Sequence, residues 1–243
     1  MNGFDLTGKV VLVTGSAKRI GREIALRLHR EGALVAIHYG GSRDEALRTA
    51  VECGNAPVFE ANLERVPEIV RLFDEVGTHF GRIDALVNNA ARFTRFNPLD
   101  VTESDWDYIH SVNLKAVFFC CQQGAKWMGR NPGGEGRIVN ISSLGGIRPW
   151  AMHAHYCASK AGVIHMTKAL AKAFAPGITV NSVAPGVITF EQSDEEAVSM
   201  LNATPAGRAG TGAEIAEAVV YFLKASNFIT GQIQAVDGGL SLR

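Results

Sequence analysis

The stretch that decides the fold is Lys9-Val-Val-Leu-Val-Thr14-Gly15-Ser-Ala-Lys-Arg19-Ile-Gly21. Its first half is a short apolar run rich in β-branched residues, which is typical of a strand buried on both faces of a parallel sheet. Its second half is a glycine-containing turn, after which apolar residues recur with helical spacing until Gly32. Strand, tight turn and helix in this order predict the start of a βαβ unit.

The same alternation continues outward from this stretch to the end of the chain. We expect strands at 9–14, 34–39, 57–60, 83–88, 137–142, 178–183 and 232–236. We expect helices at 20–31, 44–53, 67–80, 103–128, 155–173, 195–202 and 213–224. This order predicts an α/β fold, a three-layer, doubly wound parallel sheet with helices on both faces. No repeat, linker or low-complexity segment divides residues 1–243, so a single domain is predicted.

Composition excludes several classes of function. The chain has 24 basic and 24 acidic residues, so we expect neither a nucleic-acid partner nor binding to an anionic membrane. No apolar run reaches the roughly 18 residues of a membrane-spanning helix, and the first residues lack an apolar signal region. The cysteines have neither CxxC nor His/Cys ligand spacing, which predicts reduced thiols, no metal site and a cytoplasmic protein.

The glycine turn has the properties of a phosphate-binding site. Gly15 permits a tight turn, Gly21 permits close approach of helix and strand, and the helix N-terminus offers N–H groups to a pyrophosphate. NAD sites place an acid about 20 residues later for the ribose 2′-hydroxyl, but residues 32–43 contain none. We therefore predict NADP(H), with Arg19, Ser42 and Arg43 as candidate contacts of the 2′-phosphate. The alternative is that Ser42 and Arg43 only cap and flank a helix.

Three residues predict proton chemistry. Tyr156 and Lys160 are four apart in a helical segment, so both side chains lie on one face. The ammonium group, with the positive charge of an oxidised nicotinamide, is expected to lower the phenol pKa. Ser143 follows a strand end thirteen residues before Tyr156 and is expected to hold the substrate oxygen. A Y-x-x-x-K pair is common by chance, and Ser143 and the glycine turn make it specific.

Together these motifs resemble the short-chain dehydrogenase/reductase family over nearly the whole chain. The matching residues are Thr14-Gly15, Gly21, Asn88-Asn-Ala90, Asn113, Ser143, Tyr156, Lys160, Pro185-Gly186 and Asp237-Gly-Gly239. The resemblance implies a Rossmann fold, and catalysis by Asn113, Ser143, Tyr156 and Lys160. In relatives the asparagine holds a water of a proton relay, and the lysine also binds the nicotinamide ribose.

The turn and the resemblance together predict a set of cofactor-binding residues. These are Gly15, Ser16, Arg19, Ile20, Gly21, Tyr39, Ser42, Arg43, Asn62, Leu63, Asn89, Ala90, Tyr156, Lys160, Pro185, Gly186 and Ile188. Four positions depart from the family pattern, namely Arg19 for a glycine, Asn62 for an aspartate, Ala91 for a glycine and Phe190 for a threonine. The resemblance also implies a homotetramer or homodimer built on helices 103–128 and 155–173.

Three functions fit these residues. The favoured one is a reductase acting on a small-molecule carbonyl or secondary alcohol, similar to 3-oxoacyl-carrier-protein reductases, with residues 187–210 as a substrate loop. Arg92, Arg95, Lys126 and Arg130 are candidates for a basic patch facing an acyl carrier protein. The alternative is a pteridine reductase, favoured by Arg19, Phe93 and the C-terminal motif, but those enzymes usually have aspartate in place of Ser143. The third is an inactive NADP-binding sensor, which has no need of a catalytic tyrosine.

Overall fold

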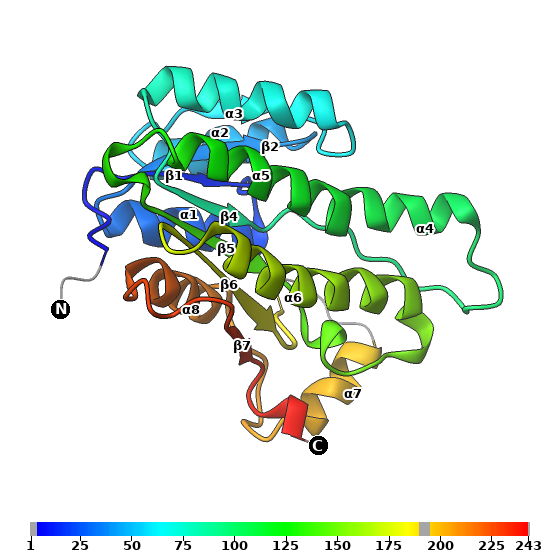
Figure 1. Cartoon of the computed structure of the whole chain (residues 1–243). Helices are drawn as coiled ribbons and strands as arrows, with labels where there is room; N and C mark the ends of the chain where they lie inside the picture. The colour runs from blue at the N-terminus through cyan, green and yellow to red at the C-terminus, as the bar shows by residue number, and fades with distance from the viewer. Residues whose placement is uncertain (1–3, 190–194, 243) are drawn as a thin grey trace.

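A computed structural model describes residues 4–189 and 195–242. They form a seven-stranded parallel sheet in the order β3-β2-β1-β4-β5-β6-β7 (Figure 1). The strands are β1 Val10–Val13, β2 Leu34–Tyr39, β3 Val58–Glu60, β4 Ala85–Asn88, β5 Gly136–Ile141, β6 Ile178–Pro185 and β7 Ile233–Val236. Each strand is parallel to its neighbours, as expected for strands joined by helical crossovers.

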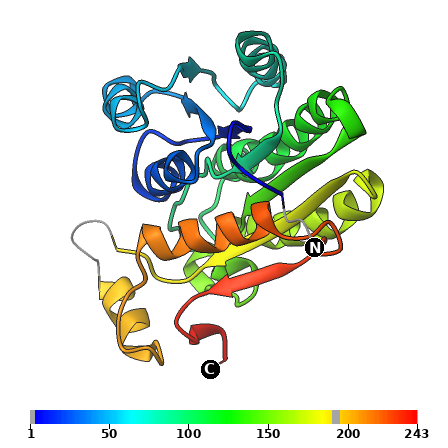
Figure 2. The ribbon, with the colours of Figure 1, turned by 90° about the vertical axis from the view of Figure 1, so that its left-hand side faces the viewer.

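Helices cover both faces of the sheet. They are α1 Arg19–Arg30, α2 Arg43–Glu52, α3 Val66–Phe80, α4 Glu103–His110, α5 Val117–Met128, α6 Ala154–Phe174, α7 Glu195–Ala203 and α8 Gly212–Lys224. In Figure 2, the blue α1 and the orange α8 lie on one side of the sheet, and the green α5 and yellow-green α6 lie on the other. The predicted single-domain α/β fold is confirmed.

The core consists of two apolar layers separated by the sheet. Val11 and Val13 of β1 pack in the layer under α1, α2 and α8, whereas Val10 and Leu12 pack in the layer under α3, α5 and α6. Successive residues of a strand point to opposite faces, so a continuous apolar run supplies both layers. All four of these residues are buried.

The predicted helix 103–128 contains one irregularity. Between α4 and α5 the chain forms a π-helical segment at Ser111–Ala116, which includes Asn113. A π-helical turn within an α-helix is rare overall, and those that occur are often found at functional sites. The segment faces the carboxyl ends of the central strands, because its side chains reach the residues that follow β4.

The strand order indicates where a binding site lies, at the point where the order reverses beside β1. The chain moves outward from β1 to β3 and then returns to β4 on the other side of β1. At such a switch point the connections after adjacent strands diverge, which opens a crevice at their carboxyl ends. Within the described residues, no helix has the length and apolar character needed to cross a membrane.

Candidate active site

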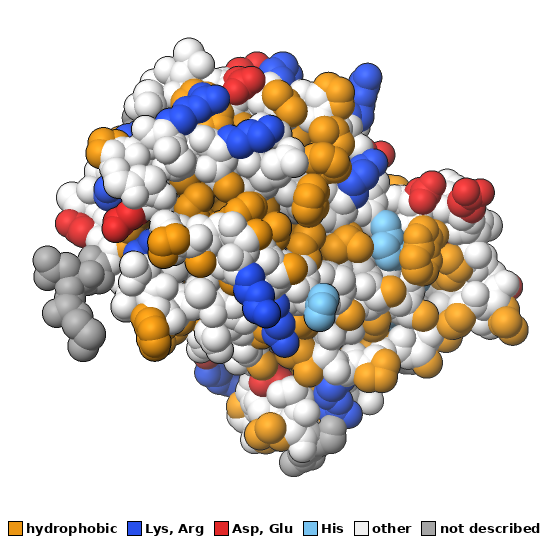
Figure 3. Space-filling model, in the orientation of Figure 1, with side chains coloured by type: hydrophobic (Ala, Val, Ile, Leu, Met, Phe, Trp, Pro, Cys, Tyr) orange, Lys and Arg blue, Asp and Glu red, His pale blue; other side chains and the backbone are white. Residues whose placement is uncertain are grey.

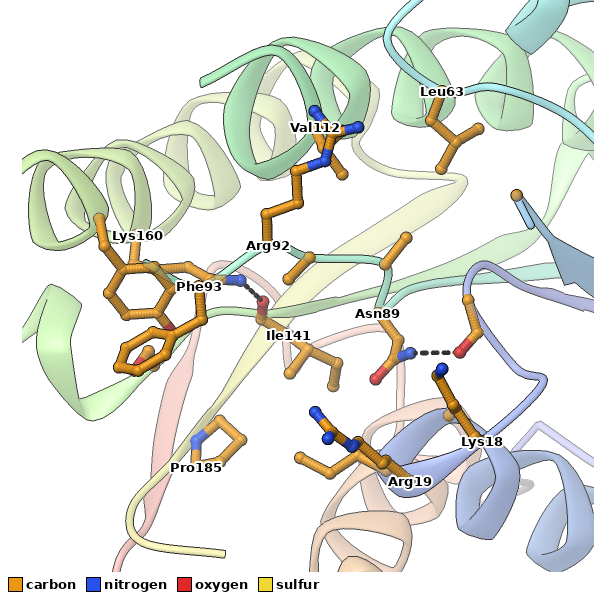
Figure 4. Close-up of a pocket in the computed structure, with 18 of the residues that line it drawn as sticks. Lys18, Arg19, Leu63, Asn89, Arg92, Phe93, Val112, Ile141, Lys160 and Pro185 are labelled. Atoms are coloured by element: carbon orange, nitrogen blue, oxygen red, sulfur yellow. Dashed lines mark hydrogen bonds between the residues drawn. The ribbon is translucent and has the colours of Figure 1, made fainter. Parts of the chain in front are cut away.

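A cavity of about 850 Å³ runs along the carboxyl ends of the strands (Figure 4). Most residues predicted to bind cofactor or to catalyse line it, from the β1–α1 turn at one end to α6 at the other. They are Gly15, Arg19, Ile20, Gly21, Tyr39, Ser42, Asn62, Leu63, Asn89, Ala90, Ser143, Tyr156, Lys160, Pro185, Gly186 and Ile188. Ser16, Arg43 and Asn113 do not line it.

The residues predicted to transfer protons meet at one end of the cavity. Ser143 follows β5 directly, and its Oγ accepts the N–H of Gly145 at 3.0 Å. Tyr156 lies in the first turn of α6 and forms a hydrogen bond with Ser143. Lys160 lies one turn further on, where its Nζ donates to the carbonyl of Ile141 at 2.9 Å, as Figure 4 shows.

Burial shifts the pKa values of Tyr156 and Lys160 in opposite directions. It raises the pKa of Tyr156 to about 12, and the hydrogen bond with Ser143 only partly opposes the rise. Burial also lowers the pKa of Lys160 to about 8. The predicted lowering of the Tyr156 pKa is therefore reversed in the protein alone, because desolvation disfavours the phenolate. A phenol that stays protonated at neutral pH suits proton donation, as a reduction requires.

The side chain of Asn113 binds the backbone of Arg92, in the connection between β4 and α4. Its Oδ1 accepts the N–H of Arg92 at 2.7 Å, and its Nδ2 donates to the carbonyl of Arg92 at 2.9 Å. The same Nδ2 lies 3.3 Å from the hydroxyl oxygen of Ser159 on α6. The π-helical segment thus fixes the β4–α4 connection against α6. The expectation that Asn113 holds a water stays a prediction.

The glycine turn leaves no room for larger side chains. A Cβ added to Gly21 lies 2.2 Å from the carbonyl oxygen of Gly15, so α1 and the turn touch only because Gly21 is glycine. Asn89 fixes the turn to the end of β4, since its Nδ2 donates to the carbonyls of Thr14 and Gly15 at 3.0 Å. Figure 4 shows Asn89 beside the part of the turn that carries Lys18 and Arg19.

Arg19 takes a backbone conformation that favours glycine. Its φ is +54°, in the left-handed region where an ordinary side chain costs about 1–2 kcal/mol. The family pattern that the chain resembles has glycine here, so Arg19 departs from it at a place where glycine would be unstrained. Backbone strain of this kind persists at functional sites, where the side chain has a task.

The outer end of the cavity carries positive charge. Lys18 and Arg19 both line it, together with Gly40, Gly41 and Ser42 after β2. Ser42 stands at the N-cap of α2 and its side chain makes no capping bond, whereas Arg43 begins the helix and agrees with the alternative that it only flanks it. Arg43 is exposed outside the cavity. Lys18 was not predicted from the sequence, where only its place beside Arg19 could have indicated it.

Ser16 faces the interior of the sheet. It is fully buried, its hydroxyl donates to the carbonyl of Val13 at 2.8 Å, and its Oγ accepts the N–H of His38 at 3.0 Å. The family motif indicates a contact with cofactor at this position, but these bonds leave Ser16 outside the cavity.

An ion pair crosses the rim between the β3 and β4 connections. Arg92 pairs with Glu64, and its guanidinium stacks on the ring of Tyr108 at 3.9 Å. Arg92 therefore has its charge balanced within the chain, and its part in a basic patch for a carrier protein stays a prediction.

Aromatic rings surround the phenol of Tyr156. Phe93 meets it edge-on with ring centres 4.8 Å apart, and Trp150 lies nearly parallel to it at 6.2 Å. Phe93 also stacks on His153 at 4.6 Å and keeps 58% of its surface exposed. Trp150 and His153 were not predicted, since nothing in their spacing distinguishes them from packing residues.

The connection after β6 closes the cavity. A Cβ on Gly186 would lie 2.6 Å from the Cα of Asp237, which accounts for glycine after Pro185 beside the C-terminal Asp-Gly-Gly motif. Met200 of α7 lines the cavity as well. Phe190, Glu191 and Asp194 of the predicted substrate loop lie outside the described residues.

The described residues, 4–189 and 195–242, contain no group of three or more His, Cys, Asp or Glu side chains arranged to hold a metal ion. All four cysteines are buried and unpaired: Cys53, Cys120, Cys121 and Cys157.

The chain is similar in sequence and in structure to known proteins. A family model described as enoyl-(acyl carrier protein) reductase matches residues 15–241. The chain is 40% identical to nodulation protein G of a Rhizobium species, covering 98% of this chain and 99% of that protein. It is 40% identical to the 3-oxoacyl-[acyl-carrier-protein] reductase FabG of Staphylococcus aureus, covering 96% and 98%. A solved short-chain dehydrogenase/reductase from Serratia marcescens matches at 34% identity with a TM-score of 0.91, covering 98% and 99%.

Proposed function

The chain belongs to the short-chain dehydrogenase/reductase family of oxidoreductases, and from this we propose that it uses NADP(H) to interconvert a carbonyl group and a secondary alcohol. The observation that carries the proposal is the placement of Tyr156, Ser143 and Lys160 at one end of a cavity whose other end is the glycine turn. A phosphate site and a proton donor in one crevice suit hydride transfer coupled to proton transfer.

The cavity fits a phosphorylated dinucleotide. Gly15 and Gly21 bring the N-terminus of α1 against the cavity without a Cβ, which suits a pyrophosphate. Lys18 and Arg19 supply cations where a 2′-phosphate is expected, and the chain has no acid at residues 32–43 to repel it. NADPH, when bound, supplies the hydride.

The residues of the chain supply the proton and the polarisation. Tyr156 is protonated at neutral pH, because burial raises its pKa to about 12, and it donates to the oxygen of the substrate. The Ser143 hydroxyl hydrogen-bonds the same oxygen and stabilises the negative charge that develops there. The Lys160 ammonium favours the phenolate left after the transfer and binds ribose hydroxyls.

A 3-oxoacyl thioester on an acyl carrier protein is the proposed substrate. The similarity to the FabG protein supports it, as does a serine, Ser143, in place of a carboxylic acid beside Tyr156. The second candidate is a pteridine reductase. The exposed Phe93 and the parallel Trp150 favour it, since rings on the cavity wall suit a flat heterocycle.

Activity with a substrate panel tests the proposal. Oxidation of NADPH and of NADH is followed with an acetoacetyl thioester, simple diketones and dihydrobiopterin. We expect turnover of the thioester and a kcat/KM that favours NADPH. A preference for NADH overturns the cofactor, and turnover of dihydrobiopterin alone selects the second candidate. Binding of NADPH without any turnover in the panel favours the sensor.

We also propose that the protein is a cytoplasmic homotetramer or homodimer. Figure 3 shows apolar side chains gathered over the face formed by α5 and α6. Trp106, Tyr108 and Phe118, from α4 and α5, are exposed aromatic residues that a second copy would cover. Light scattering of the purified protein tests this, and a monomer at micromolar concentration contradicts it.

A further inference from the structure

His38 connects two walls of the cavity from inside the protein. It lies near the end of β2 and is buried, with 2% of its surface exposed. Its Nδ1 lies 2.9 Å from the backbone nitrogen of Gly15, and its Nε2 lies 3.1 Å from the carbonyl oxygen of Ala61. A carbonyl only accepts, so Nε2 carries the proton, and Nδ1 is left to accept the N–H of Gly15. A single neutral tautomer satisfies both contacts.

The backbone of His38 holds the next residue of the turn as well. Its carbonyl accepts the N–H of Ser16 at 3.0 Å, and its own N–H donates to the Ser16 hydroxyl at 3.0 Å. The first two N–H groups of the glycine turn therefore point to β2 instead of the cavity. The N–H groups left for a pyrophosphate belong to the residues that follow, at the start of α1.

We propose that His38 is a positioning residue of the dinucleotide site, which sets the glycine turn in its binding conformation and fixes it to the connection after β3. That connection carries Asn62 and Leu63, which line the cavity immediately after Ala61. The inference rests on the proposed binding of a nicotinamide dinucleotide. His38 lies at the cavity wall with 2% of its surface exposed, and its ring acts on the site through Gly15 and Ala61.

The imidazole of His38 is neutral at neutral pH. Burial lowers the pKa of His38 to about 4, and the Ala61 carbonyl opposes this only in part. No charged side chain contributes to the shift. Protonation would place a proton on Nδ1 and remove the acceptor of Gly15, so a neutral ring is the form that the turn requires.

Three substitutions separate the two hydrogen bonds. In His38→Asn the amide oxygen takes the place of Nδ1 and still accepts from Gly15. In His38→Gln the amide nitrogen takes the place of Nε2 and still donates to Ala61. His38→Phe keeps the ring and makes neither bond. The readouts are the Kd for NADPH by fluorescence titration, and KM and kcat with an acetoacetyl thioester.

We expect the Kd and KM for NADPH to rise about tenfold in the Phe and Gln variants, since a turn without its buried acceptor takes other conformations in the free protein. The Asn variant retains an affinity within about twofold of the wild type, and kcat stays within about twofold in all three. If His38 had a purely structural role, the Kd of each variant would instead change in proportion to its loss of thermal stability. The matched control is Asn131→Ala, which removes a bond from Asn131 Nδ2 to the Ile83 carbonyl (2.8 Å) at the opposite end of the sheet. It is expected to lower Tm without changing the Kd.

Equal affinity of the Phe variant and the wild type overturns the inference and leaves the proposed function intact. If the Phe variant does not fold, the comparison of Asn with Gln decides, and equal affinities of those two overturn the inference. A wild-type protein that binds neither NADPH nor NADH overturns the proposed function together with the inference.

Discussion

The two ends of the cavity are built by different means. At the outer end, hydrogen bonds from side chains to the backbone connect neighbouring turns, as in the contacts of Asn89 with Gly15 and of His38 with Ala61. At the inner end, stacked rings such as Phe93 and Trp150 stand around Tyr156. Directional bonds specify one ligand shape, whereas ring faces accept a range of flat or apolar groups. Under the proposed function, we therefore expect the outer end to bind the cofactor and the inner end to select the substrate.

The largest test of this division is Tyr156→Phe. We expect kcat to fall about 10³-fold, because the variant lacks the proton donor, whereas the ring and its packing remain. The Kd for NADPH should change less than about twofold, since the cofactor end is untouched. Turnover at the wild-type rate would show that another group donates the proton. An unchanged kcat with a weakened Kd would place the tyrosine at the cofactor end.

Ser143→Ala is the next test. The substitution removes the hydroxyl that polarises the substrate oxygen, and we expect kcat to fall about 10²-fold. The hydrogen bond of Ser143 also lowers the Tyr156 pKa, so its loss leaves the phenol a weaker acid. Single-turnover rates with the thioester check the prediction. A rise in KM without loss of kcat would assign Ser143 to substrate binding alone.

The pH profile tests the role of Lys160. Burial lowers its pKa to about 8, so the ammonium is charged below this pH and neutral above it. The charge favours the phenolate formed as Tyr156 gives up its proton, hence we expect kcat for reduction to fall as the pH rises through about 8, by about tenfold per unit. The Lys160→Met variant should have a low kcat that does not change with pH across the same range. A wild-type profile that stays level to pH 9.5 contradicts the assignment.

Arg19→Gly gives the smallest effects, in opposite directions. Loss of the cation should lower kcat/KM for NADPH about tenfold and leave that for NADH unchanged. Relief of the left-handed backbone should stabilise the fold by about 1 kcal/mol, or roughly 2–4 °C in Tm. Calorimetry and kinetics with both cofactors check the two parts. Equal losses with NADPH and NADH would indicate that Arg19 contacts the pyrophosphate instead of the 2′-phosphate.

The cofactor end was also the more predictable from sequence. The glycine turn, the strand before it and the helix after it are adjacent in the chain, so local pattern predicted them within a few residues. The pair of Tyr156 and Lys160 was readable for the same reason, since helical spacing determines its geometry.

Contacts between distant segments were missed. The bond of His38 to Gly15 joins residues 23 apart, and the pair of Arg92 with Glu64 joins residues 28 apart. Ser16 was expected in the cavity because the family motif includes it, but the pairing of β1 with β2 directs its bonds inward. The pKa of Tyr156 moved opposite to expectation, because a sequence shows the neighbouring lysine and not the depth of burial.

The π-helical segment between α4 and α5 has a consequence for insertions and deletions. Such a segment corresponds to one residue inserted into a regular helix, and each residue turns a helix by about 100°. Deleting one residue of Ser111–Ala116 would restore regular hydrogen bonding, but would rotate α4, with Trp106 and Tyr108, relative to α5 by that angle. Asn113 would then lose its hold on Arg92. The contacts of Asn113 thus require a fixed number of residues in the helical stretch from α4 to α5. We expect insertions and deletions among relatives to fall in the connections before α4 and after α5.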